Sequence, residues 1–67
     1  MNSFGENLRN LRKLNKISQK DFAKKMNTTQ QRVSKWERDR VEPSLYKIIK
    51  IIKVLNTSFE ELTDDIE

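Results

Sequence analysis

The sequence predicts an all-α fold, a compact bundle of five short helices. Its 67 residues include a single glycine and a single proline, so long stretches are free of helix breakers. Apolar residues recur at helical spacing, and a Ser or Thr suited to cap a helix precedes the first, second, third and fifth of the expected helices. The length is near the lower limit for independent folding and no linker-like or low-complexity stretch divides the chain, so residues 1–67 are expected to form one domain.

The first helix is expected to begin after Ser3. Ser3 and Glu6 have the spacing of a capping box, in which each side chain satisfies a free backbone amide. One apolar stripe then follows, formed by Phe4, Leu8, Leu11 and Leu14. Asn15 and Lys16 interrupt the stripe and predict a turn.

The second helix is expected over about 19–26, with Ser18 as its cap and Ile17 packed against Phe22. It should bury Phe22, Ala23 and Met26. Asn27 tolerates the left-handed backbone that ends many helices, which places a tight turn there.

The third helix is expected to begin at about Thr29, although Thr28 is an alternative cap because Gln31 lies three residues after it. Val33 and Trp36 form its apolar pair.

The segment 38–44 is polar and ends after Pro43, and residues 45–55 form the most hydrophobic helix, which we expect to be the central element of the core. Lys47, Lys50 and Lys53 should form its solvated side. Asn56 ends it, and a capping box from Ser58 to Glu61 introduces a short fifth helix whose apolar residues are Phe59, Leu62 and Ile66.

Composition makes several classes of function improbable. The chain has no cysteine and no histidine, so we expect no disulfide, no metal site and no cofactor, and an enzyme has almost no support. No small-molecule ligand is evident. The longest apolar run, 48–55, is interrupted by lysines and no signal-peptide pattern is present, so we expect a cytoplasmic protein without a membrane partner.

Charge is unevenly distributed along the chain. Residues 1–40 hold eleven Lys/Arg and four Asp/Glu, a net charge of +7, whereas residues 41–67 hold three and six, a net charge of −3. A basic region of this kind suits a polyanionic partner. Charge by itself supports an ordinary solvated surface equally well.

The second and third helices together predict a helix-turn-helix over about 18–37. The small Ala23 permits two helices to cross closely, and a turn of three or four residues sets a steep angle between them. With Val33 and Trp36 facing inward, the side chains that point most directly outward are Gln31, Ser34, Lys35 and Arg38. Gln30 lies nearer the flank, in the first turn.

The outward side chains suit the major groove of DNA. Glutamine can pair with adenine N6 and N7, and lysine can donate to guanine O6 and N7, so we interpret Gln30, Gln31 and Lys35 as base readers. The expected contacts to the DNA backbone are Thr29, Arg38, Arg40 and Lys16. Arg32 is either a backbone contact or a simple surface charge.

Residues 8–62 resemble the Cro/phage-repressor family of helix-turn-helix DNA-binding proteins, often called XRE-like. Three segments carry the resemblance, in order and spacing: LRNLRKLNKISQKDFA, NTTQQRVSKWERDR and EPSLYKIIKIIKVLN. The resemblance implies a lambda-repressor-like bundle of five helices, a third helix that enters the major groove, and a homodimer on a two-fold symmetric operator.

The resemblance also implies roles for individual residues. The base-reading positions fall on Gln30, Gln31, Ser34 and Lys35, and Gln19 matches a glutamine that meets a phosphate. Arg12 and Glu37 match a pair that bridges the first helix to the end of the third. The chain departs from the family at four positions: Asn27 and Asp39, where the family usually has glycine, Thr28, where it has a branched apolar residue, and Trp36, which is larger than usual.

The resemblance further implies that the homodimer pairs near the C-terminus. The apolar candidates are Leu55, Phe59, Leu62 and Ile66, although they can instead close the core of a single chain. The acidic end at 63–67 either repels DNA or forms a flexible tail.

The leading functional hypothesis is sequence-specific binding to double-stranded DNA by a transcriptional regulator, a repressor that reads a palindromic operator. The alternative is a protein-interaction module, such as an antitoxin or anti-repressor partner. The two can coexist, because antitoxins of this family also bind DNA.

Overall fold

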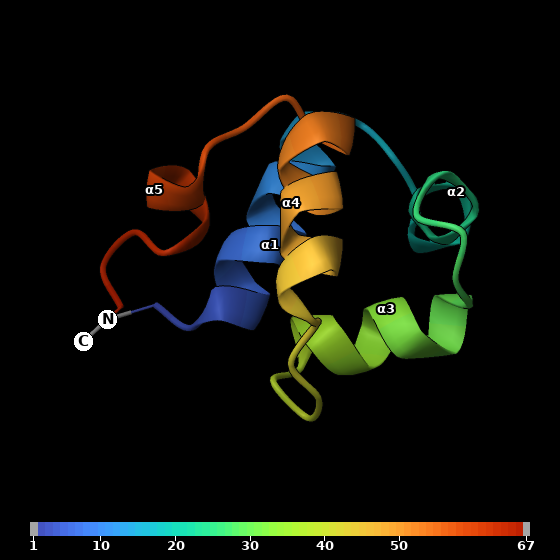
Figure 1. Ribbon diagram of the computed structural model, residues 1–67, viewed down its shortest axis with the longest axis horizontal. Coiled ribbons are helices and arrows are strands. Elements are labelled where there is room, and N and C mark those ends of the chain that lie inside the picture. The colour runs from blue at the N-terminus through green and yellow to red at the C-terminus, as the bar shows by residue number, and fades with distance from the viewer. Residues whose placement is uncertain (1, 67) are drawn as a thin grey trace.

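The computed structural model describes residues 2–66, and it contains five α-helices and no strand within that range (Figure 1). The helices are α1 (Phe4–Leu14), α2 (Gln19–Lys25), α3 (Gln30–Glu37), α4 (Leu45–Val54) and α5 (Phe59–Leu62). The prediction of an all-α fold with five helices is therefore confirmed.

Each helix begins after a Ser or Thr whose backbone is extended and whose side chain accepts from an amide of the first turn. At α1 the predicted capping box is complete, since Ser3 accepts from the Glu6 amide and the Glu6 carboxylate accepts from the Ser3 amide. Thr29 is the cap of α3, so the alternative at Thr28 is wrong. At α5 the Ser58 hydroxyl accepts from the Glu61 amide, and it donates to the Glu61 carboxylate, which is not the reciprocal bond of a capping box.

Four helices end at a residue with left-handed backbone, and none of these residues is glycine. Asn27 and Asn56 have φ angles of 56° and 50°, as expected for asparagine at these turns. Lys16 and Asp39, with φ angles of 57° and 59°, adopt the same conformation. At Lys16 the sequence does not predict it, because a lysine has no local hydrogen bond to offset the crowding of its Cβ.

The core lies where α1, α2, α3 and α4 meet, and α5 closes one side of it. Its buried apolar residues are Leu8, Phe22, Ala23, Met26, Val33, Trp36, Ile51, Leu55 and Leu62. Between residues 2 and 66, none of the helices combines the length and the apolar character that crossing a bilayer requires.

Two expectations about apolar faces are wrong. Leu14 belongs to the sequence stripe of α1, but its side chain is 76% exposed because it is the last residue of the helix and extends beyond the core. Residues of α4 were expected to be central, but Leu45 is 66% exposed and Ile49 is also exposed. α4 packs on the core through Ile51 and the residue that follows the helix, Leu55, which are buried, and through the partly buried Ile48, Ile52 and Val54.

Lys47 is also placed differently from its prediction as a solvated charge. Its Nζ donates to the Met26 carbonyl over 3.1 Å, at the C-terminal end of α2. A cation is favourable there because the last carbonyls of a helix carry partial negative charge. The contact joins α4 to α2.

Asparagine side chains hold the C-terminal part of the chain to α1. The buried Asn7 amide donates to the carbonyls of Leu62 and Asp64, both over 2.9 Å, and the Asn15 amide donates to Leu55 over 3.2 Å. The two Asn7 bonds, with one from the Asn2 amide to the Asp65 carbonyl, tie the segment 62–65 to the start of the chain. The flexible acidic end expected at 63–67 stays a prediction, and Glu67 lies outside the described residues.

Candidate nucleic-acid interface

The crossing of α2 and α3 forms the frame of the interface. Figure 1 shows α2 nearly end-on while α3 runs across the base of the bundle, so the two helices cross steeply. Ala23 is buried at this crossing, and the turn is closed by the Thr28 amide, which donates to the Ala23 carbonyl over 2.9 Å. Val33 and Trp36 are buried and commit one side of α3 to the core.

The opposite side of α3 is polar and lies in the open. Gln30, Gln31 and Lys35 are exposed and Ser34 is half-buried. Their spacing of three and four residues places them on neighbouring turns of one face. Together with Gln19 of α2 and Arg38 after α3, they line a single shallow hollow.

The remaining predicted backbone contacts surround this face unevenly. Thr29 accepts from the Arg32 amide over 3.1 Å as the cap of α3, and both residues line a small hollow with Gln31 and Lys35. Arg40 and Lys16 are exposed, but neither lines the two hollows of α3.

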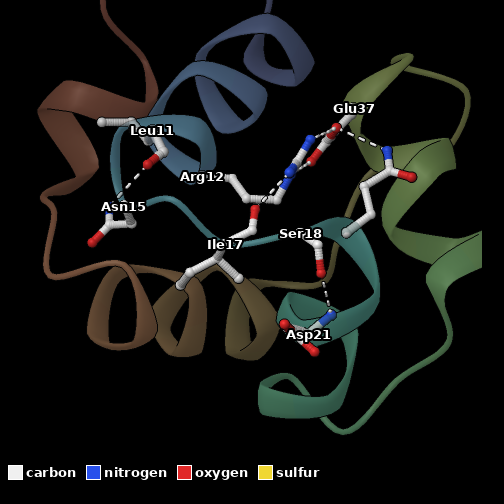
Figure 2. Close-up of polar contacts among 8 residues, drawn as sticks. Leu11, Arg12, Asn15, Ile17, Ser18, Asp21 and Glu37 are labelled. Carbon is white, nitrogen blue, oxygen red and sulfur yellow. Dashed lines mark hydrogen bonds and ion pairs between the residues drawn. The ribbon is translucent and has the colours of Figure 1, made fainter.

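A buried ion pair joins α1 to α3. The Arg12 Nε lies 2.6 Å from Glu37 Oε2, and Nη2 donates to Oε1 over 3.2 Å, so the guanidinium holds both carboxylate oxygens. Nη1 donates to the Ile17 carbonyl over 2.7 Å, between α1 and α2 (Figure 2). Both side chains are nearly inaccessible to water, and every charged atom of the pair has a partner.

Gln19 is the third member of this group. Its Nε2 donates to Glu37 Oε1 over 3.0 Å. The Glu37 carboxylate, at the end of α3, therefore binds both Arg12 of α1 and Gln19, the first residue of α2. The sequence alone does not predict this bond, because Gln19 and Glu37 are 18 positions apart. The bond holds a side chain of the polar hollow in one orientation.

A family model described as helix-turn-helix matches residues 8–62, most of the chain. The chain belongs to the Cro/C1-type helix-turn-helix family. A search of curated proteins and a search of solved structures each returned no match. Membership of this family makes the chain a DNA-binding helix-turn-helix protein and a transcriptional regulator.

The end of the helix-turn-helix is fixed to α1 through Asp39, a contact that the sequence does not predict. The Asp39 carboxylate accepts from the Gly5 amide over 2.9 Å and from the Ser3 hydroxyl. A negative charge is favourable at this helix N-terminus because the first amides point toward it. Asp39, at a position where the family usually has glycine, therefore adds hydrogen bonds that a glycine cannot make, and these form a second cap for α1.

Gly5 permits the same close approach. A Cβ built on it would lie 2.7 Å from the Trp36 carbonyl oxygen and would be still closer to that of Glu37. The only glycine of the chain is thus needed for contact between α1 and α3, a role that its position in a helix does not reveal.

The four dimer candidates have different surroundings. Leu55 and Leu62 are buried in the core of their own chain, which agrees with the alternative that these residues close the core of a single chain. Phe59 is 56% exposed and Ile66 is also exposed. Both line an apolar groove with Phe4, Val41, Pro43 and Ile48.

Ala23→Leu should overpack the crossing of α2 and α3. We expect a loss of about 1–3 kcal/mol in the free energy of unfolding, because three carbon atoms must enter a filled space. DNA affinity should fall by more than the loss of folded protein accounts for, because α3 is displaced. Urea denaturation and a gel-shift titration measure the two effects, and Lys24→Leu, at the next, exposed position, is the control. A parent-like midpoint would contradict the close crossing.

Proposed function

We propose that the protein is a transcriptional repressor that reads a palindromic operator by placing α3 in the major groove. One observation carries the proposal: Gln30, Gln31, Ser34 and Lys35 line one open hollow, while Val33 and Trp36 on the other side of α3 are buried. Side chains with these donors and acceptors suit base edges in the groove. A repressor needs only to occupy its site, so DNA binding by this fold is sufficient for the role.

The proposed contacts to the DNA backbone set the position of α3 and carry no sequence information. They are Gln19, Thr29, Arg38, Arg40, Lys16 and Arg32. The side-chain amide of Gln19 has two N–H donors. One is bonded to Glu37, and the other remains for a phosphate oxygen.

We propose that the operator is bound by a homodimer. One helix-turn-helix covers one half-site, and two copies related by two-fold symmetry read a palindrome. The exposed Phe59 and Ile66, in their apolar groove, support this region as the contact between copies.

Selection from a pool of random duplexes tests the proposal. We expect an enriched inverted repeat whose half-site centres lie about one helical turn, or 10–10.5 bp, apart. Selection at physiological salt that enriches no motif would rule out sequence-specific binding. An enriched motif without symmetry would rule out the dimer and retain the reading helix.

Gln31→Ala should lose about 1–3 kcal/mol of binding free energy at one operator position and relax the preference there. Arg38→Ala is the comparison: it should weaken binding to all duplexes and lower the slope of log affinity against log salt by about one unit. Titrations against the selected operator, its single-base variants and a random duplex measure both. Equal losses by Gln31→Ala on every duplex would remove it from the base readers.

A second function, binding to a protein partner as an antitoxin or anti-repressor component does, is favoured by the apolar groove. The groove has no residue in common with the polar hollow of α3, so a partner bound there would leave α3 open to DNA and would compete with the second copy of the homodimer. In this case Gln31→Ala would leave the partner complex intact, whereas Phe59→Ser would weaken it. Co-purification of the two variants with the partner separates the functions.

A further inference from the structure

A second hollow lies beside the polar face of α3, and α1 forms one side of it. Its lining includes Arg9 and Lys13 of α1, together with Gln19, Ser34 and Arg38. The last three also line the hollow of α3. The two hollows are therefore adjacent, and the surface proposed to meet DNA extends onto α1.

The direction of Arg9 and Lys13 follows from the ion pair described above. Arg12 faces α3, because it is bonded to Glu37. Arg9 lies three residues before Arg12, and Lys13 lies directly after Arg12. Because Arg9 and Lys13 are four residues apart, their side chains lie on consecutive turns of α1. Both are exposed, unlike Arg12, and both border the end of α3.

Charge makes this hollow selective for anions. The one carboxylate in its lining, that of Glu37, is neutralised by Arg12. Three cations remain, on Arg9, Lys13 and Arg38. Among residues 2–66, the side chains of Arg9 and Lys13 have neither an ion pair nor a hydrogen bond, so their donors are available to a ligand.

We propose that Arg9 and Lys13 form a second site for the DNA backbone, which holds phosphates next to the stretch read by α3. The inference rests on the proposed DNA-reading role of α3 and extends it from one helix to two. An arginine and a lysine one helical turn apart suit successive phosphates of one strand, and Arg38 connects them to α3. The site adds affinity without adding sequence preference.

The test compares the parent with the double variant Arg9→Gln, Lys13→Gln. The control is Lys50→Gln, Lys53→Gln, which removes the same charge from α4. Glutamine has nearly the helix propensity of the residues it replaces, so both variants should keep the parent's circular dichroism and thermal midpoint. The probes are the duplex selected by the parent and a random duplex of equal length, each titrated between 50 and 200 mM NaCl.

We expect the double variant on α1 to lower the salt slope by about two units on both duplexes, since each phosphate contact contributes about 0.9, and to weaken binding on the order of tenfold at the higher salt. Ethylation interference should show one or two phosphates that matter for the parent and not for the variant, with the base pattern unchanged. The α4 control should retain the parent slope.

Two results would overturn the site. A parent-like slope for the α1 variant means that no phosphate is held there. An equal fall for the α4 control, with an unchanged ethylation pattern, means that only the overall charge matters. If the parent itself selects no duplex, the proposed function fails. If the parent selects a motif and the α1 variant binds that motif equally well, only the second phosphate site fails.

Discussion

Glu37→Ala should lower the free energy of unfolding by about 3–5 kcal/mol, the largest effect that we expect from a single substitution. Arg12 and Glu37 are each 7% exposed. Removing the carboxylate leaves a guanidinium buried without a counter-charge, which costs more than the attraction itself contributed. A domain of this size has a total stability of roughly 3–10 kcal/mol, so the variant should be close to unfolded at room temperature.

Urea denaturation measured by fluorescence of Trp36 is suited to this test, because Trp36 is the single tryptophan and is buried beside Glu37. The control is the double variant Arg12→Met, Glu37→Met, which replaces both charges by apolar groups and should recover most of the lost stability. The double variant should still bind DNA more weakly than the parent, since Gln19 no longer has its acceptor. A loss below 1 kcal/mol for Glu37→Ala would show that the pair is hydrated and contributes little.

Gly5→Ala should destabilise the protein by about 3 kcal/mol, the second large effect. The expected sign is unusual, because glycine to alanine inside a helix normally adds about 1 kcal/mol of stability. Here the added Cβ meets the backbone carbonyls of Trp36 and Glu37 at distances that no real contact has. Backbone atoms cannot rotate out of the way as a side chain can, so α1 must move away from the end of α3. The hydrogen bond from the Gly5 amide to the Asp39 carboxylate must then lengthen.

The matched control for Gly5→Ala is Asn10→Ala, at an exposed position of the same helix, which should be neutral or slightly stabilising. Thermal and urea midpoints of the two variants, compared with the parent, measure the difference. A Gly5→Ala variant as stable as the parent would contradict the close contact of α1 with α3.

The parts of the fold that depend on neighbours in sequence could be predicted from sequence. Ser3, Ser18 and Thr29 each cap a helix through an amide three residues away. The left-handed turn at Asn27 likewise follows from its own side chain. The candidate polar face of α3 follows from helical spacing as soon as Val33 and Trp36 are assigned to the core.

The contacts that organise the candidate site depend on distant residues. Gln19 meets Glu37 across 18 positions, Gly5 meets Asp39 across 34, and Asn7 meets Leu62 across 55. Gln19, Glu37, Asp39 and Asn7 are residue types that ordinarily lie on the surface, so nothing in the local pattern distinguishes them. The same holds for Leu14, Leu45 and Ile49, whose apolar character predicted burial that the packing does not provide.

The sequence by itself therefore determined the helices, their caps and the polar face of α3, because the hydrogen bonds and spacings that set them span three or four residues. Only the tertiary structure decided which charges are buried, which apolar residues stay exposed, and that Arg9 and Lys13 border α3. The reason is physical: burial and pairing depend on which helices approach one another, and for α1 and α3 the Gly5 backbone contact and the Arg12–Glu37 pair fix that approach.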